Sequence, residues 1–289
     1  MKLPVRLMRL IRLIRVITPP RMQRRFIAGL LAPVLFALGM PAQALSGPDC
    51  LRLAYPEFWA AQIAHTGPDD VLVSRSGERF VFDQHKDLLP HTELLNQADL
   101  KSQMMQPYSA GFQAAPPLPH QDPGRMRSHA FFTAMYGATL DEVQGHVVPV
   151  PWAPSGGSLM FTRRNGAAPA LERVGRTLAQ DAATAAYVRR PAGSLNWRRV
   201  AGTQRLSMHA WGAAVDFSLP HGLGRYWQWS GCSEQGACPY PAKVLKDAKL
   251  QRVVEVFEQE GFIWGGKWAH FDTVHFEYRP ELVGPACSR

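Results

Sequence analysis

The chain has 289 residues, 46% of them hydrophobic, which suits one globular catalytic domain with an added segment. Its formal net charge is +9, but residues 1–44 contain eight basic side chains and no acidic one. The remainder is therefore close to neutral, which excludes a nucleic-acid-binding role based on overall basicity.

Residues 1–44 have the pattern of a secretory signal peptide. Arg24-Arg25 form a charged region, Phe26–Met40 a short apolar core, and Ala42-Gln43-Ala44 a small-x-small cleavage site. The apolar run is short for a membrane span and is interrupted by Pro33. We therefore expect cleavage after Ala44, export to the periplasm or cell wall, and no membrane span in the mature chain. An uncleaved anchor is the alternative.

Residues 45–150 are predicted to form an N-terminal accessory region. A proline-rich stretch, AAPPLPHQDPG at 114–124, is interpreted as a linker or a wrapping segment. The elements expected here are helices over 51–64 and 94–105, strands over 71–73 and 79–82, and a helix start at 139–143.

Residues 151–289 are predicted to form the catalytic domain. Helices beside a few short strands indicate an α+β fold, with a small antiparallel sheet that is flanked by helices. Asn165 is expected to cap a helix that runs through 167–189. Further elements are expected as strands over 159–161, 196–200 and 213–217, and a helix over 250–260 that stops at Gly261.

Two stretches contain the residues that indicate metal chemistry. The first, RLSMHAWGAAVDFS, supplies His209 and Asp216, and the second, GFIWGGKWAHFDTVHFEYR, supplies Asp272 and His275. Two histidines and a carboxylate are a common ligand set for catalytic zinc, which keeps a fourth position open for water. On spacing alone, a hydrogen-bonded His/Asp cluster without metal explains these residues equally well.

Strand alternation predicts where these side chains point. In AAVDF, Val215 and Phe217 face one side, so Asp216 faces the other. In HFEYR, His275 and Glu277 share one face. Glu277 is therefore placed to accept a hydrogen bond from the ring N–H of a ligand histidine, although a plain surface carboxylate is the alternative.

The order of the motifs is more specific than any one of them. The pattern S-x-H-x-x-G-x-A-x-D, followed by W-G-G-x-W-x-x-x-D-x-x-H-F-E, resembles the zinc D-alanyl-D-alanine carboxypeptidases and dipeptidases (VanY/VanX-type) and the phage L-alanyl-D-glutamate endolysins. The resemblance extends from about Val150 to Leu282 and implies one Zn²⁺ per chain. It implies His209, Asp216 and His275 as ligands, with Asp272 as the general base that takes a proton from the zinc-bound water.

The resemblance also implies an arginine, upstream of the S-x-H motif, that holds the substrate. A carboxypeptidase must bind a free α-carboxylate, and arginine does so with two hydrogen bonds. Arg198, Arg199 and Arg205 lie in this part of the chain, and we assign the role to Arg198. Ser207 is expected to bond substrate backbone, with a local turn bond as the alternative.

The sequence therefore predicts an exported zinc peptidase that acts on the stem peptides of peptidoglycan and removes a terminal D-alanine. An L-alanyl-D-glutamate endopeptidase is the close rival, because its branch shares the aspartate base. A non-catalytic cell-wall binding module on the same scaffold is the third alternative. The chain contains no S-x-x-K, K-T-G or HExxH motif, which excludes the serine enzymes that trim these peptides and thermolysin-like peptidases.

The four cysteines follow the leader, and an even number in an exported chain indicates disulfides. Three connectivities are possible. We expect Cys232–Cys238, which closes a small loop, and Cys50–Cys287, which joins the ends of the mature chain. His270 is expected to flank the cleft. The other histidines show no ligand spacing and are interpreted as surface or structural residues: His65, His85, His91, His120, His129, His146 and His221.

Overall fold

The computed structural model describes residues 47–60, 64–66, 69–236, 238–284 and 287. They belong to one compact unit, Gln43–Arg289. The predicted signal peptide lies outside these residues. Within the described ranges, we find no helix whose length and apolar character would let it span a bilayer.

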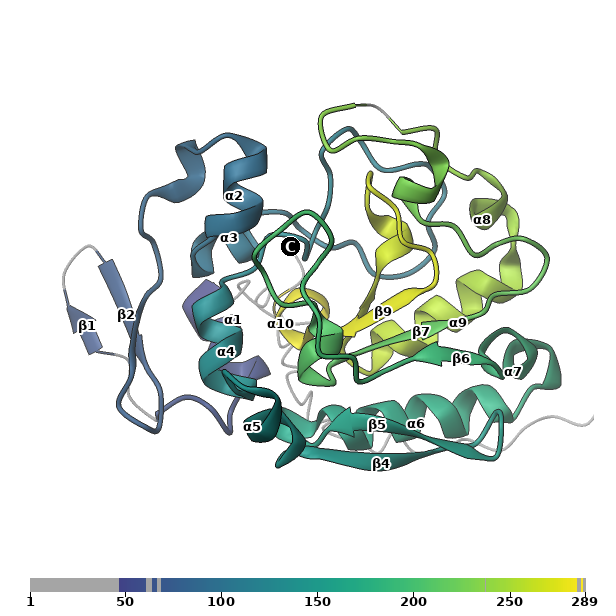
Figure 1. Ribbon diagram of the computed structural model, residues 1–289, viewed down its shortest axis with the longest axis horizontal. Helices are drawn as coiled ribbons and strands as arrows, with labels where there is room; N and C mark the ends of the chain where they lie inside the picture. The colour runs from purple at the N-terminus through teal and green to yellow at the C-terminus, as the bar shows by residue number, and fades with distance from the viewer. Residues whose placement is uncertain (1–46, 61–63, 67–68, 237, 285–286, 288–289) are drawn as a thin grey trace, which may run out of the picture. The chain divides into compact units, whose positions relative to one another are not determined.

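The predicted α+β class is confirmed by a four-stranded antiparallel sheet with helices beside it (Figure 1). The strands stand in the order β6-β7-β9-β8. Their bounds are β6 Pro191–Gly193, β7 Ala214–Phe217, β8 Phe262–Trp264 and β9 His275–Tyr278.

One face of this sheet is apolar and is covered by helices α6 (Ala167–Ala179), α7 (Ala182–Val188) and α9 (Ala248–Gln259). Phe217 and Phe276 contribute to this core, and the Phe276 ring stacks on Phe257 of α9 with centroids 4.1 Å apart. The alternation predicted for β7 and β9 is therefore correct. Asp216 and His275 project from the opposite face.

A separate hairpin packs against α6. It consists of β4 (Val147–Trp152) and β5 (Gly157–Thr162), paired antiparallel along their whole length. Buried Trp152 anchors it by donating a 2.8 Å hydrogen bond from Nε1 to the carbonyl of Val188.

The N-terminal part has its own small sheet, in the order β1-β2-β3, and several short helices. Their bounds are α1 Gly47–Ala54, β1 Ala64–Thr66, β2 Asp69–Val73, β3 Arg79–Val81, α2 His91–Gln97, α3 Leu100–Met104, α4 His129–Tyr136 and α5 Leu140–Gln144.

A second apolar cluster joins this N-terminal part to the C-terminal half. Trp59 stacks on Phe131 with ring centroids 5.3 Å apart, and the cluster continues through Trp211 to Ala214 of β7. Core residues from both sides of the predicted boundary at 150/151 are thus packed together. The assignment of 45–150 as an accessory region stays a prediction.

Two helices expected as continuous are broken by aspartate caps. The segment predicted over 167–189 divides where Asp181 accepts a hydrogen bond from the Ala183 N–H and starts α7. The segment predicted over 94–105 divides where Asp99 accepts from the Ser102 N–H and starts α3. In both cases the short polar side chain satisfies a backbone donor that a continuous helix would bond internally.

Three further local predictions were wrong. The helix predicted over 51–64 ends at Ala54. Asn165 is not a helix cap, because it adopts a left-handed conformation (φ 51°) and Gly166 stands at the start of α6. The strand predicted over 196–200 is reduced to one isolated bridge, between Arg199 and Leu206.

Both expected disulfides are present. The Cα atoms of Cys50 and Cys287 lie 5.5 Å apart, and those of Cys232 and Cys238 lie 5.4 Å apart. The remaining short helices are α8 Lys243–Lys246, α10 Pro280–Val283, and the 3₁₀ turns η1 Lys86–Leu88, η2 Arg164–Gly166, η3 Met208–Trp211, η4 Trp227–Ser230 and η5 Gly265–Lys267.

Candidate metal centre

The pairing of β7 with β9 brings two predicted ligands together. Asp216 stands directly opposite His275 in the antiparallel register. His209 arrives from η3, and the turn from η3 into β7 is made at Gly212, whose φ is +62°. A Cβ at this glycine would lie 2.9 Å from Val147 Cγ2, so the chain needs glycine here to turn and pack closely.

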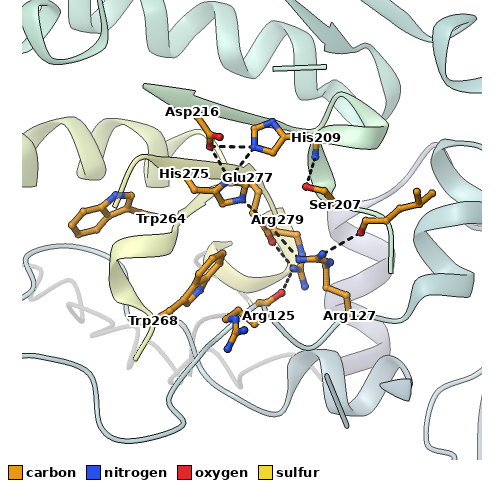
Figure 2. A network of polar contacts seen from close by, with 12 residues as sticks. Arg125, Arg127, Ser207, His209, Asp216, Trp264, Trp268, His275, Glu277 and Arg279 are labelled. Carbon is orange, nitrogen blue, oxygen red and sulfur yellow. Dashed lines mark hydrogen bonds and ion pairs between the residues drawn. The ribbon is translucent and has the colours of Figure 1, made fainter. Parts of the chain in front are cut away.

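The three predicted ligand atoms form a nearly equilateral triangle (Figure 2). His209 Nε2 lies 3.1 Å from Asp216 Oδ1 and 3.1 Å from His275 Nδ1, and the latter lies 3.0 Å from Asp216 Oδ1. Donor atoms of a tetrahedral zinc ion with bonds of about 2.0–2.1 Å stand about 3.3 Å apart. The observed triangle fits such an ion to within a few tenths of an ångström.

The hydrogen bonds on the far side of each ring leave the nitrogen lone pairs facing this triangle. His209 Nδ1 lies 2.7 Å from the carbonyl oxygen of Ser194, which can only accept, so Nδ1 carries the proton. His275 Nε2 lies 3.0 Å from Glu277 Oε2 and likewise donates. Both imidazoles are therefore held in the tautomer that a metal ligand requires.

The charges of the site favour ionised carboxylates. Burial opposes ionisation, but the neighbouring imidazoles of His209 and His275 hold the pKa of Asp216 far below its ordinary value. Burial also opposes the ionisation of Glu277, yet Arg127 and His275 lower its pKa to about 2. His275 lies between the two carboxylates, which raise its pKa to about 10 against the effect of burial. A cation is thus favoured at this position.

A chain of buried ionic contacts extends from the site toward the N-terminal part. Arg279 donates to Glu277 at 2.9 Å and to Glu281 at 2.7 Å. Glu281 in turn accepts from the Tyr55 hydroxyl at 2.5 Å and from the Gln103 amide at 3.0 Å. All five side chains are buried. Because Glu277 has no exposure to solvent, the alternative of a plain surface carboxylate is wrong.

Asp272, the predicted base, sits in the turn between η5 and β9. Its N–H donates to the Gly265 carbonyl at 2.9 Å, and its carbonyl accepts from the His275 N–H at 3.2 Å. The side-chain Oδ1 is buried and has no hydrogen-bond partner among the residues that the structure describes. Burial raises the pKa of this carboxyl to about 7, and Asp216 adds to the rise while His275 opposes it. A carboxyl with such a pKa can exchange protons near neutrality.

A pocket of about 240 Å³ contains the predicted ligands and Asp272. Its walls include Trp268, whose ring lies 5.7 Å from that of His275, and Trp229, which is exposed. Arginines line the rest: Arg125, Arg127, Arg198 and Arg205.

Three of these arginines, Arg125, Arg127 and Arg205, are buried. Arg205 donates from Nη1 to the Arg125 carbonyl, and its Nε has no hydrogen-bond partner among the described residues. Burial, followed by repulsion from Arg127 and Arg125, lowers the pKa of Arg205 to about 9. Burial likewise lowers the pKa of Arg127 to about 10. Both remain charged at neutral pH, so the pocket holds positive charge that an anionic ligand would neutralise.

The predicted substrate-binding residues both line this pocket. Arg198 is exposed at the pocket, and its backbone carbonyl accepts from the Ser207 N–H. The Ser207 hydroxyl accepts a hydrogen bond from the His209 N–H at 3.3 Å, so it makes the local turn bond and caps η3. Its hydroxyl proton remains available to a ligand. The role of either residue toward substrate stays a prediction.

Sequence reasoning missed Arg125 and Arg127, which enter the pocket from the N-terminal part (Figure 2). The local sequence GRMRSHA has no motif, and two basic residues alternating at such spacing are common on protein surfaces. Their burial depends on the tertiary packing of this segment against the sheet, which no short pattern predicts.

The comparison with protein families supports the same chemistry. Residues 201–278 match the M15 peptidase family model described as D-alanyl-D-alanine carboxypeptidase, which confirms the resemblance over this stretch. The match supports a zinc-dependent metallopeptidase that acts on peptidoglycan. Neither the curated proteins nor the solved structures yielded a match.

Proposed function

We propose that this chain, whose residues 201–278 match the D-alanyl-D-alanine carboxypeptidases, is an exported enzyme that removes the terminal D-alanine from peptidoglycan stem peptides. The observation that supports this proposal most is the triangle of His209, Asp216 and His275 beside the buried carboxyl of Asp272. A binding module would not need a carboxyl with a raised pKa next to the ligands.

The arginines favour a substrate that carries a free carboxylate near the bond to be cut. Arg127 and Arg205 are buried at the pocket, and Arg198 stands exposed there. Arg205 Nε has no hydrogen-bond partner among the described residues. A carboxylate bound by Arg198 would face this positive charge, since guanidinium–carboxylate pairs are among the stronger polar contacts. A terminal D-alanine presents such a group one residue from its scissile bond.

Each residue of the site has a separate role in the proposed reaction. Zinc bound by His209, Asp216 and His275 would supply a water activated at neutral pH. Asp272 accepts a proton in the pocket and delivers it to the leaving amine. Glu277 keeps His275 oriented, while Arg198 fixes the substrate carboxylate. The tryptophan side chains of the pocket restrict the access of bulk water.

Digestion of purified muropeptides, followed by mass spectrometry, tests the proposal. The carboxypeptidase is expected to release one alanine from a pentapeptide stem and to leave a tetrapeptide. Cleavage after the first L-alanine, which releases the peptide that begins with D-glutamate, would instead identify the endopeptidase. The aspartate at position 272 also suits that enzyme. Unchanged substrate with a zinc-loaded, folded protein would indicate the binding module.

Two variants separate these results from a loss of folding. Asp272→Asn is expected to keep zinc and lose hydrolysis, because the ligands remain in place. His275→Ala is expected to lose both. Normal cleavage by Asp272→Asn would rule out the assigned base.

A further inference from the structure

A second group of metal-type side chains lies beside the same pocket, which one of its members, His270, lines. His91, Asp122, Glu234 and His270 come from four separate segments, yet their ligand atoms all lie within 4.8 Å of one another. His91 begins α2, Asp122 lies within the proline-rich stretch at 114–124, and Glu234 lies in the loop closed by Cys232–Cys238. None of these four residues belongs to the predicted zinc ligands, and none is the predicted base.

His270 is held in the tautomer of a ligand. Its Nδ1 lies 2.7 Å from Asp122 Oδ2, and its backbone N–H donates to Asp122 Oδ1 at 2.9 Å. The proton therefore resides on Nδ1, and Nε2 carries the lone pair. The residue is 3% exposed, and within the described part of the chain its buried Nε2 has no hydrogen-bond partner. An aspartate that orients the far nitrogen of a histidine is the usual support of a metal-binding imidazole.

A second imidazole nitrogen faces the same point. His91 Nε2 is also buried without a partner, and it lies 3.7 Å from Glu234 Oε1 and 3.9 Å from Asp122 Oδ2. His270 Nε2 lies 3.8 Å from the same Glu234 oxygen. Two unpartnered nitrogens thus converge on one carboxylate oxygen. A movement of about 0.5 Å would bring each nitrogen to about 3.3 Å from this oxygen, the spacing found between donor atoms around zinc.

The charge of the cluster suits a divalent cation. Arg125 holds Glu234 with two hydrogen bonds of 2.8 Å and also contacts Asp122 at 3.2 Å. Two carboxylates and one guanidinium leave one negative charge when both imidazoles are neutral. Arg125 fixes the Glu234 carboxylate without contacting either imidazole nitrogen in any hydrogen bond found among the described residues.

We propose that His91, Glu234 and His270 bind a second Zn²⁺ ion, with Asp122 orienting His270. Imidazole nitrogens with a carboxylate oxygen form a donor set typical of zinc. The ion would join α2, the disulfide-closed loop and the segment that leads into Asp272, and would fix one wall of the pocket. This site is independent of the proposed peptidase activity and adds to the single zinc that the sequence predicts.

The experiment measures zinc per chain by inductively coupled plasma mass spectrometry, on full-length protein equilibrated at micromolar free zinc. The wild type is expected to bind two ions. His91→Ala and His275→Ala are each expected to bind one, and the double variant none. Co²⁺ substitution gives a second readout, because two sets of visible absorption bands are expected and each single variant should remove one.

His120→Ala is the matched control. The His120 ring lies 4.8 Å from that of His91, but it is exposed and does not belong to the cluster. This variant is expected to keep two ions. Glu234→Gln provides a second test if His91→Ala does not fold, and it is expected to halve the zinc content.

One zinc ion in the wild type, with an unchanged content in His91→Ala and Glu234→Gln, would overturn the proposal and leave the cluster as an ion-pair network. Because His275→Ala removes only the ion of the β7–β9 site, failure of the second site remains distinguishable from failure of the proposed peptidase centre.

Discussion

Tyr55 and Glu281 lie 226 residues apart in the sequence, and the Tyr55 hydroxyl donates a 2.5 Å hydrogen bond to the Glu281 carboxylate. Through Arg279 and Glu277, this contact continues to the imidazole of His275. A residue of the N-terminal part therefore supports the orientation of a candidate metal ligand, with three charged side chains between them.

Removal of this hydroxyl tests the support directly. Tyr55→Phe is expected to lower the free energy of unfolding by about 1–3 kcal/mol, because the buried Glu281 loses a donor. Tyr187→Phe is the matched control, since its hydroxyl contacts Asp247 away from the metal site. Chemical denaturation of both variants measures the difference. An equal or smaller loss for Tyr55→Phe would show that the contact contributes little.

Glu277→Gln is expected to weaken zinc binding by about 10–100-fold, the usual effect of removing a carboxylate that orients a ligand histidine. It also leaves the buried Arg279 and Arg127 with less compensating charge, so the free energy of unfolding should fall by about 3–5 kcal/mol. Competition with a zinc chelator measures the affinity. Glu260→Gln serves as the control, because Glu260 pairs with the half-exposed Arg173 at the surface. Equal zinc affinities in the two variants would contradict the assigned role.

The pH dependence of kcat/KM should report Asp272. The base must be ionised, and burial raises its pKa to about 7, so activity is expected to fall as the pH drops through this region. A bound divalent cation favours the ionised form and moves the acidic limb to lower pH. Asp272→Asn is expected to reduce kcat by about 10²–10⁴-fold and to abolish the limb. The absence of an acidic limb at and below this pH would show that another group acts as base.

Arg198→Gln is expected to raise KM for stem peptides that end in a free carboxylate, by roughly 10-fold or more, since a charge-assisted contact contributes about 1.5–3 kcal/mol. An amidated peptide should show no such change, because it lacks the anion. Arg199→Gln is the neighbouring control. Equal effects of Arg198→Gln on both peptides would show that this arginine does not bind the carboxylate.

The two disulfides should differ in their effect on stability. Cys50 and Cys287 are separated by 237 positions in the sequence, and Cys232 and Cys238 by 6. Removal of the first disulfide is expected to lower the free energy of unfolding about twice as much as removal of the second. The chain-entropy model gives roughly 5 and 2 kcal/mol respectively. Paired serine variants, compared by denaturant titration, measure both. A larger loss of stability on removal of Cys232–Cys238 would instead indicate that this loop stabilises the pocket through Glu234.

Strand alternation was sufficient to predict the faces of β7 and β9, because buried apolar residues leave little choice for the polar ones between them. It therefore predicted that Asp216, His275 and Glu277 leave the core. The breaks at Asp99 and Asp181 were not predicted, although both residues are good helix caps. The apolar periodicity continues across both aspartates and therefore predicts an unbroken helix in each case.

Contacts between distant segments could not be predicted from short patterns. Arg127 reaches Glu277 only because its segment packs against the sheet face that carries the ligands. His91, Glu234 and His270 come from three segments that are far apart in the sequence, so no sequence spacing indicates their proximity. The neighbours of His91 in sequence are typical of an ordinary surface or structural residue, and its contact with Glu234 follows from tertiary structure alone.

The opposition of Asp216 and His275 across β7 and β9 has a consequence for folding. A slip of one residue between these strands would turn one of the two side chains into the apolar face and leave the triangle incomplete. Zinc can then bind only to chains that have paired correctly. Zinc binding would therefore shift the equilibrium between the two registers toward the correctly paired one.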